Sequence, residues 1–267
     1  MPFTDLHSHI LPGFDDGASD DAEFLAMARA AVRGGTARMI ATPHYDLETP
    51  GLELYAVLAA VEEHRALLRS EEISLELVPG VEVRLNAALY RLAREGGALE
   101  PLSLGDSGKY LLGDLPLIDM PAATTDILFQ VQLCGLTPIL AHPERNRYLT
   151  KRHDELREIV ERGVEVQINS GSLEGIYGRE ARHSAFALLG EGIARLVASD
   201  AHSPDGRSPD LSGASRIIRE RWGSGAANIL LEVNPERVLA GEALTDAVAE
   251  APRSPRRRRL FSRRESR

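Results

Sequence analysis

The chain alternates between short apolar runs and longer amphipathic segments, and this alternation constrains its fold more than any other feature. Runs such as 139–141 and 196–198 are apolar at every position, as is typical of strands buried on both faces of a parallel sheet. Seven strands that alternate with helices predict an α/β fold with right-handed crossovers. The expected strands are 3–7, 37–41, 73–83, 109–112, 137–141, 164–168 and 195–198.

Capping residues and glycines indicate where the helices begin and end. Ser19 is expected to cap the first helix, because acidic side chains fill the turn that follows it. A second helix is expected to begin near Thr49 and Pro50, since proline suits the first helical position. Further helices are expected near 87–94, 122–134, 151–162 and 180–189.

The length of 267 residues and the hydrophobic content of 43% suffice for one large domain. We expect that domain over residues 1–250, followed by a disordered Arg-rich tail over 251–267. Cys134 is the single cysteine, so an intramolecular disulfide is excluded. No apolar run approaches the length of a membrane span, and no signal-peptide pattern precedes the first strand, so a cytoplasmic location is expected.

The net charge of −9 is unevenly distributed along the chain. Residues 252–267 carry +7, so the remaining residues carry −16. An acidic domain argues against a nucleic-acid partner and agrees with a carboxylate-rich metal site. The basic tail is interpreted as a solvated end, with contact to anionic lipid or an acidic partner at a membrane surface as the alternative.

Histidines and carboxylates recur where the expected strands end. His7 and His9 project to the same side of the first strand, as two imidazoles must to hold one metal ion. Alone, the pair would be interpreted as two solvated histidines. The carboxyl ends of parallel strands, however, meet at the edge where active sites assemble. The candidate ligands at this edge are His7, His9, Asp16, His44, Glu82, Asp114, His142, Asp200 and His202.

Five imidazoles and four carboxylates favour Zn, Mn or Fe, and are too nitrogen-rich for Ca or Mg alone. Nine ligands exceed the needs of one ion, so a cluster of two or three is predicted. Ions about 3.5–4 Å apart can stabilise both the attacking and the leaving oxygen of a phosphoester hydrolysis. The ligand set therefore predicts a hydrolase that activates water with metal ions.

Two arginines follow candidate ligands closely. Arg145 comes three residues after His142, and Arg207 comes five residues after His202. Guanidinium groups bind phosphate oxygens through paired hydrogen bonds, so the two arginines favour an anionic substrate over surface salt bridging. Asn169 and Ser170 end another strand at the same edge and are candidates for the polar lining of the pocket.

Other phosphatase chemistries are not supported by the sequence. A cysteine-dependent phosphatase needs an arginine six residues after its cysteine, and Leu140 occupies that position after Cys134. The chain has no GxxxxGK[ST] sequence, which argues against a P-loop nucleotidase. His64, His153 and His183 fall in expected helices among charged residues and are interpreted as solvated.

The ordered motifs resemble those of the polymerase-and-histidinol-phosphatase (PHP) superfamily. Within it, the HSHILP and DDG sequences and the DAH sequence that continues to DGR are similar to the capsule-type bacterial tyrosine phosphatases, the CpsB/CapC/YwqE-like group. The resemblance covers about residues 1–241. The motifs that carry it are 5–9, 15–17, 41–44, 80–82, 141–145 and 199–202.

The resemblance implies a distorted (β/α)7 TIM-like barrel, the PHP fold, with a cluster of three metal ions, usually manganese. Asp16 is favoured over Asp15 as the ligand from the DDG sequence. Asp114 stands where the family commonly has glutamate, and its shorter side chain can still reach an ion. The implied ligands are His7, His9, Glu82 and Asp200 for the first ion, Glu82, Asp114 and His142 for the second, and Asp16, His44 and His202 for the third.

The function implied by the resemblance is metal-dependent hydrolysis of phosphotyrosine in proteins. The expected substrate is a bacterial tyrosine autokinase that controls exopolysaccharide or capsule synthesis. Arg145 and Arg207 match the family's phosphate-binding arginines and, with His142, are the expected catalytic residues. One alternative is a small-molecule phosphatase, such as one for histidinol phosphate. A second is a metal-binding domain that serves assembly without catalysis.

Overall fold

The computed structural model describes residues 2–49 and 53–248, and within them nine parallel strands form two sheets. The smaller sheet has the strand order β1-β2-β4, and the larger has the order β3-β5-β6-β7-β8-β9. The α/β class and the parallel pairing predicted from the sequence are confirmed. The strands are β1 Phe3–Ser8, β2 Thr36–Ala41, β3 His44–Tyr45, β4 Glu76–Pro79, β5 Glu82–Arg84, β6 Tyr110–Asp114, β7 Thr137–Ala141, β8 Glu165–Asn169 and β9 Leu196–Ala198.

Nine strands replace the seven expected runs for two reasons: the run expected over 73–83 is divided between the two sheets, and a short further strand, β3, follows the run expected over 37–41 and lies in the other sheet. The break between β2 and β3 falls at Thr42 and Pro43, and proline has no N–H with which to extend a ladder. The break between β4 and β5 falls at Gly80. A Cβ atom there would lie 2.7 Å from Cγ2 of Ile40, so this crossing requires glycine. The expected single strand over 73–83 is therefore wrong.

The two sheets also meet where β1 and β9 end. Ser8 forms an isolated parallel bridge with Ala201. The Asp200 amide donates to the His7 carbonyl at 2.9 Å, and the His9 amide donates to the Ala201 carbonyl at 2.8 Å. The first and last strands of the fold thereby bring their carboxyl ends together.

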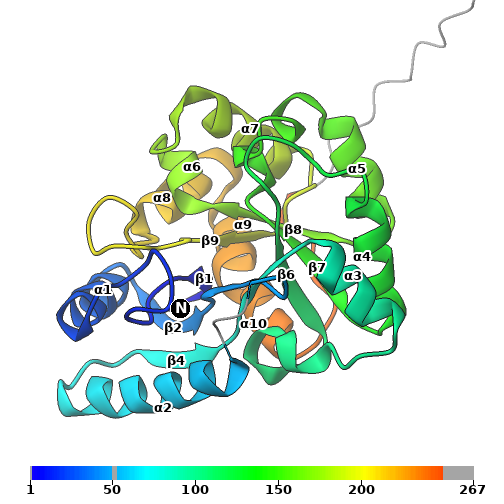
Figure 1. The fold of residues 1–267 in the computed structure, drawn as a ribbon. Coiled ribbons are helices and arrows are strands. Elements are labelled where there is room, and N and C mark those ends of the chain that lie inside the picture. The colour runs from blue at the N-terminus through cyan, green and yellow to red at the C-terminus, as the bar shows by residue number, and fades with distance from the viewer. Residues whose placement is uncertain (1, 50–52, 249–267) are drawn as a thin grey trace, which may run out of the picture.

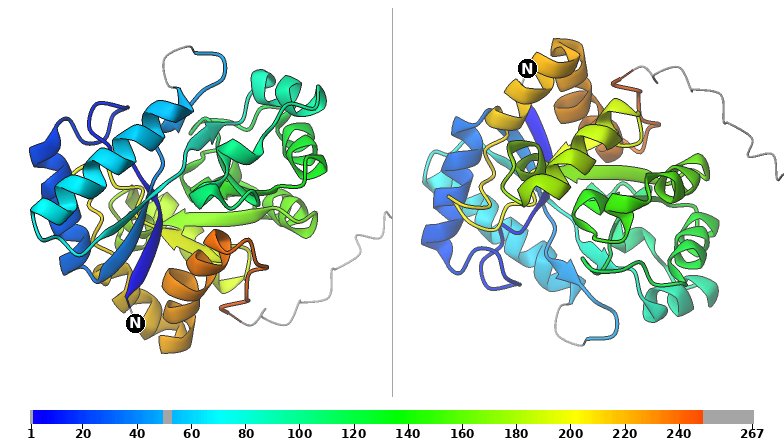
Figure 2. Two further views of the ribbon diagram at one scale, coloured as in Figure 1. Left: turned by 90° about the horizontal axis from the view of Figure 1, so that it is seen from below. Right: turned by 90° about the horizontal axis from the view of Figure 1, so that it is seen from above.

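Helices surround the strands on the outside of the molecule (Figure 1). In both views of Figure 2, α1 and α2 lie on one side of the strands, and the helices coloured green lie on the opposite side. The α-helices are α1 Asp21–Arg33, α2 Leu54–Ser70, α3 Ala87–Arg94, α4 Thr124–Leu133, α5 His153–Glu161, α6 Ser170–Glu174, α7 Gly178–Gly190, α8 Ser212–Trp222, α9 Ser224–Asn228 and α10 Asn234–Leu239.

Two expected helix starts are wrong. Asp20, and not Ser19, caps α1, because the extended Asp20 accepts a hydrogen bond from the Glu23 amide. Ser19 instead donates to the Glu23 carboxylate from its own amide and hydroxyl. The second helix begins at Leu54, after residues 50–52, which lie outside the described residues.

Two clusters of buried side chains hold the fold together. The larger cluster lies between the strands and the helices and includes Phe24 of α1. The smaller cluster consists of side chains from the strands, of Leu104 from a 3-10 turn before β6, and of Val238 from the C-terminal helix α10. Its buried members are Leu6, Ile40, Leu104, Tyr110, Leu112, Ile139, Ala141, Leu196, Ala198 and Val238.

Among residues 2–49 and 53–248, no helix combines the length and the apolar character that crossing a bilayer requires. The predicted Arg-rich tail at 251–267 lies outside the described residues.

Candidate metal centre and phosphate site

The fold brings all nine candidate ligands together in the region where β1, β6, β7 and β9 end and where β3 and β5 begin. Four overlapping groups form, and within each group one ligand atom per residue lies within 4.8 Å of the others. These groups share members, so the nine side chains make one continuous cluster. The groups are His9, Asp16, His44 and His202; His7, Glu82 and His142; His7, His9 and Asp200; and His44, Glu82 and Asp114.

The two histidines of β1 are oriented by partners on their far sides. His7 Nδ1 lies 3.0 Å from Oε1 of Gln167, and His9 Nδ1 lies 2.6 Å from Oδ2 of Asp15. The two Nε2 atoms face each other at 3.1 Å. Ligating histidines are commonly held through the other ring nitrogen in this way, which leaves Nε2 free for a metal.

Glu82 occupies the centre of the cluster and is fully buried at the start of β5. Oε1 lies 3.0 Å from His142 Nε2, and Oε2 lies 2.8 Å from His44 Nδ1. Oε2 has no well-directed hydrogen bond, so this buried oxygen retains acceptor capacity. Burial acts to raise the pKa of Glu82, but the His7 charge and the hydrogen bonds from histidines hold that pKa well below its usual range.

Asp200 connects the histidines to the two arginines. Oδ1 lies 3.4 Å from His9 Nε2 and 3.5 Å from His7 Nε2. Oδ2 accepts hydrogen bonds from Arg145 and Arg207, both at 2.7 Å, and from Asn169 at 2.6 Å. The Asp200 carboxylate thus directs Oδ1 toward the histidines of the cluster and Oδ2 toward both guanidinium groups.

Asp16 and Asp15 have different positions, which bears on the choice between them. Asp16 lies at the rim, with 65% of its side chain exposed, and its Oδ1 is 3.2 Å from His202 Nε2 and 3.5 Å from His44 Nε2. Asp15 lies behind His9, where the His9 hydrogen bond overcomes the effect of burial and lowers the Asp15 pKa to about 2. This geometry suits Asp16 as a ligand and Asp15 as the residue that orients His9.

Asp114 at the end of β6 lies at the edge of the cluster. Its Oδ1 is 3.9 Å from His142 Nε2, and its Oδ2 pairs with Arg84 at 2.6 Å. Burial and the neighbouring Glu82 charge raise the pKa of Asp114. A positive charge close to Asp114 and Glu82 would relieve this repulsion.

The net negative surroundings of His9 and His142 are also evident in the pKa values of their imidazoles. Burial acts to lower the pKa of His9, but Asp15, Asp200 and Glu82 raise it to about 10. Hydrogen bonding to Glu82 likewise overcomes burial at His142 and raises its pKa to about 9. These surroundings favour positive charge inside the cluster, which divalent cations supply, so the donor set fits the expected metal ions.

His142 and Asp200 share an uncommon backbone conformation. Both adopt positive φ angles, 34° at His142 and 53° at Asp200, directly after β7 and shortly after β9. Non-glycine residues in this region are rare and are concentrated at functional sites. The turn at each strand end directs the side chain into the cluster.

Two polar residues of β8 support the site. Gln167, which the sequence analysis did not identify, contacts His7 and donates from Nε2 to Asn169 Oδ1 at 2.9 Å. Asn169, predicted as pocket lining, is fully buried and binds Asp200. The two residues are spaced i and i+2 and, together with Glu165, alternate with the apolar residues of β8, and this alternation was a usable signal.

Glu144 anchors the end of β8 from the segment after β7. Its Oε1 accepts hydrogen bonds from the Asn169 amide at 2.9 Å and from the Ser172 hydroxyl at 2.6 Å. Ser170 is buried and lines the adjacent cavity. Glu144 lies in the motif at 141–145, but no role was predicted for it from the sequence.

The histidines interpreted as solvated have different environments. His64 is buried, and that interpretation is wrong, because its ring packs 4.5 Å from the Phe24 ring and bonds to the Ala60 carbonyl. His153 is half-buried and lies 2.9 Å from the Ser184 hydroxyl. His183 is exposed, as expected.

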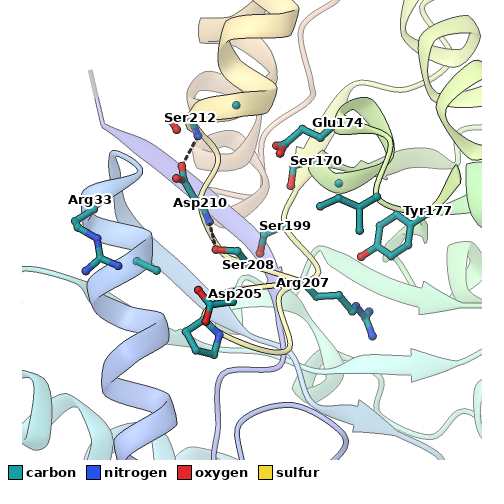
Figure 3. Close-up of a pocket in the computed structure, with 16 residues that line it drawn as sticks. Arg33, Ser170, Glu174, Tyr177, Ser199, Asp205, Arg207, Ser208, Asp210 and Ser212 are labelled. Atoms are coloured by element: carbon teal, nitrogen blue, oxygen red, sulfur yellow. Dashed lines mark hydrogen bonds between the residues drawn. The ribbon is translucent and has the colours of Figure 1, made fainter.

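A cavity of about 450 Å³ adjoins the arginine side of the cluster (Figure 3). Arg207 and Tyr177 line one side of the cavity, and Arg33 of α1 lines the opposite side. The cavity is mostly polar and extends the site beyond the two guanidinium groups.

Comparison with known families identifies the chain. Residues 3–240 match the family model described as capsular polysaccharide synthesis, CpsB/CapC. The protein belongs to the CpsB/CapC family. The match spans β1 through α10 and therefore includes every candidate ligand.

Members of the CpsB/CapC family with curated names resemble this chain over most of their length. Tyrosine-protein phosphatase YwqE of Bacillus subtilis is 36% identical over 258 residues, which cover 96% of this chain and 98% of the relative. CpsB of Streptococcus pneumoniae, also named a tyrosine-protein phosphatase, is 28% identical over 90% of this chain and 99% of the relative. The putative tyrosine-protein phosphatase CapC of Staphylococcus aureus is 29% identical over 74% of this chain and 76% of the relative.

Solved structures support the same relationship. One chain comes from the crystal structures of YwqE and CpsB, which are described as unique metal-dependent tyrosine phosphatases. It matches with a TM-score of 0.84 and 34% identity over 94% of this chain and 100% of that chain. A β-aspartyl dipeptidase of Fervidobacterium islandicum matches with a TM-score of 0.54 and 13% identity, which indicates a shared fold alone.

Proposed function

We propose that this CpsB/CapC family protein is a metal-dependent protein-tyrosine phosphatase. The observation that carries the proposal is the convergence of Arg145 and Arg207 on the same oxygen of Asp200, a residue whose other oxygen faces the histidine cluster. An anion bound by both guanidinium groups would lie beside the cluster. The names of YwqE, CpsB and CapC support phosphotyrosine as the substrate.

The nine ligands are proposed to hold two or three divalent ions, with manganese favoured and zinc or iron as alternatives. His7, His9, Glu82 and Asp200 would hold the first ion, Glu82, Asp114 and His142 the second, and Asp16, His44 and His202 the third. The Glu82 oxygen that retains acceptor capacity and the facing Nε2 atoms of His7 and His9 support this assignment. Bound ions would supply Lewis acidity and activate water as the nucleophile.

The chain's own residues would bind and neutralise the phosphoryl group. Each guanidinium uses one N–H on Asp200 and retains further donors, since arginine has five. Arg207 Nε is buried and has no hydrogen-bond partner within the described part of the chain. Both arginines would bind phosphoryl oxygens and stabilise the charge that develops in the transition state. His142 would contribute as a ligand through Nε2, and water would supply the proton to the leaving phenolate.

The distorted (β/α)7 barrel remains a proposal for the fold. Joined end to end, β2 with β3 and β4 with β5 would each form one bent strand, and seven strands would then follow one another from β1 to β9. The Ser8–Ala201 bridge supports closure between β9 and β1. The smaller cluster of buried side chains, with Val238 at its end, would fill the interior.

The biological setting is inferred from the relatives. We propose that the phosphorylated substrate is a bacterial tyrosine kinase that controls capsule or exopolysaccharide synthesis, in the cytoplasm. The basic residues at 251–267 are proposed to be a solvated end, with contact to an anionic membrane surface as the alternative.

The deciding experiment compares turnover of a phosphotyrosine peptide with turnover of histidinol phosphate by the manganese-loaded protein. We expect preference for the peptide, and loss of activity in His9→Ala and on chelation of the metal. Arg145→Ala should lower kcat by about 10²–10³-fold, as loss of a preorganised oxyanion donor does. Arg152→Ala, which removes a half-exposed arginine outside the cluster, is the matched control.

A preference for histidinol phosphate would retain the metal centre and assign the protein to small-molecule metabolism. Activity on neither substrate would favour a metal-binding domain that serves assembly without catalysis. Unchanged turnover in Arg145→Ala would exclude Arg145 as a residue that binds the phosphoryl group.

A further inference from the structure

Tyr177 lies in a short loop whose backbone fixes its position. Two glycines with left-handed φ angles flank it, Gly175 at 91° and Gly178 at 87°. The Ile176 amide donates to the Gly171 carbonyl at 2.9 Å, and the Gly178 amide donates to the Gly175 carbonyl at 3.1 Å. This loop joins α6 to α7 and holds the phenol ring at the edge of the arginine site.

The face of the Tyr177 ring packs on Arg145. The central guanidinium carbon of Arg145 lies 4.0 Å from the ring centroid, within the range of a cation–π interaction. A Cβ atom on Gly171 would lie 3.0 Å from Cε2 of Tyr177, so the absence of a side chain there lets the ring pack against α6. The ring therefore restricts the guanidinium that also binds Asp200.

The hydroxyl end of Tyr177 reaches the second arginine. In Figure 3 the phenol directs its oxygen toward the Arg207 side chain. Burial raises the pKa of the Tyr177 hydroxyl, and the charges of Arg207 and Arg145 act in the opposite direction, as does a hydrogen bond to Arg207. Tyr177 also lines two cavities, one of which is lined by Arg207 and the other by Arg145.

We propose that Tyr177 is a positioning residue that holds both phosphate-binding arginines, Arg145 through its ring and Arg207 through its hydroxyl. The inference rests on the proposed function, because it assumes that the two guanidinium groups bind the phosphoryl group. Long arginine side chains lose conformational freedom when they bind an anion, and a fixed aromatic partner reduces that loss. Tyr177 thereby preorganises the site without touching the reacting atoms.

The test measures binding of inorganic phosphate to the manganese-loaded protein by calorimetry, together with kcat and KM on a phosphotyrosine peptide. Tyr177→Phe keeps the ring and removes the hydroxyl, whereas Tyr177→Leu removes both contacts. We expect Tyr177→Leu to weaken phosphate binding about three- to thirtyfold, the range of cation–π strengths. Tyr177→Phe should recover part of that loss, and KM should rise in the same order.

Tyr148 provides a matched control. Its ring packs 3.9 Å from the guanidinium carbon of Arg152, and its hydroxyl donates to Glu155 at 2.9 Å. Tyr148→Leu removes a similar contact from an arginine outside the phosphate site, so phosphate affinity should stay within twofold of wild type. Bound manganese, measured in each variant, should equal the wild-type content.

The possible outcomes separate this inference from the proposed function. Wild-type phosphate affinity in both Tyr177 variants, with wild-type KM, would overturn the positioning role and leave the phosphatase intact. An equal loss in Tyr148→Leu would also overturn it, because the effect would then be a general loss of stability. Absence of phosphate binding by the wild type would overturn both proposals.

Discussion

Asp15 binds the ring nitrogen of His9 that faces away from the cluster, with Oδ2 of Asp15 2.6 Å from Nδ1 of His9. The same carboxylate accepts hydrogen bonds from the amides of His44 and Gly17 at 3.0 Å. One residue therefore orients a candidate ligand and fixes the backbone of a second. The neighbouring Asp16 presents its own carboxylate to the cluster from the rim.

We expect Asp15→Asn to weaken metal binding about 10–100-fold, because partners of ligating histidines have effects of this size. Titration of the metal-free protein with manganese would measure the change. Asp21→Asn is the control, since Asp21 contacts His64, a histidine outside the cluster, at 3.2 Å. Equal manganese affinity in Asp15→Asn and wild type would contradict the role given to Asp15.

Asp114 is expected to hold one ion of the cluster. Asp114→Ala should reduce the bound manganese by about one ion per chain, whereas Asp114→Glu should retain it, because a carboxylate remains within reach. Elemental analysis after dialysis would measure the stoichiometry. Arg84→Ala provides the control for loss of the Arg84–Asp114 ion pair. Full metal content in Asp114→Ala would show that Asp114 is not a ligand.

Glu165 should make stability depend on pH. Burial raises the pKa of Glu165 above its ordinary value of 4.5, although Arg195 at 2.8 Å opposes the shift. The folded state then binds a proton more tightly than the unfolded state, so the stabilisation from Glu165 is complete below pH 4.5 and is lost as pH rises through the raised pKa.

Urea unfolding of wild type and Glu165→Gln between pH 4 and 7 would measure this dependence. The stability of the wild type relative to the variant should fall as pH increases over that window. A difference that stays constant or rises with pH would contradict the prediction.

The ring of Phe24 is fully buried beneath α1 and packs against His64. Phe24→Ala should lower the free energy of unfolding by about 3–5 kcal/mol, since removal of a core aromatic leaves a cavity. Chemical denaturation would measure the loss. Phe129→Ala is the control, because 56% of Phe129 is exposed, and its effect should be much smaller. Equal losses in both variants would contradict the assignment of Phe24 to the core.

The candidate ligands could be predicted from the sequence because they lie at or near the ends of the expected strands. His142 and Asp200 follow apolar runs, and parallel strands deliver the residues after them to one edge. The interruption of the 73–83 run at Gly80 was not predicted, because it arises from a contact between strands, the approach of Gly80 to Ile40.

The sequence by itself determined the strand and helix alternation, the nine polar side chains at strand ends and the two arginines, since each of these is local. Only the tertiary structure decided that one oxygen of Asp200 faces the histidines while the other binds the arginines. It also decided how Gln167 and Asp15 orient His7 and His9, and how Tyr177 packs on Arg145. These relationships join residues from separate strands and loops. Their geometry depends on packing between elements, which no local pattern encodes.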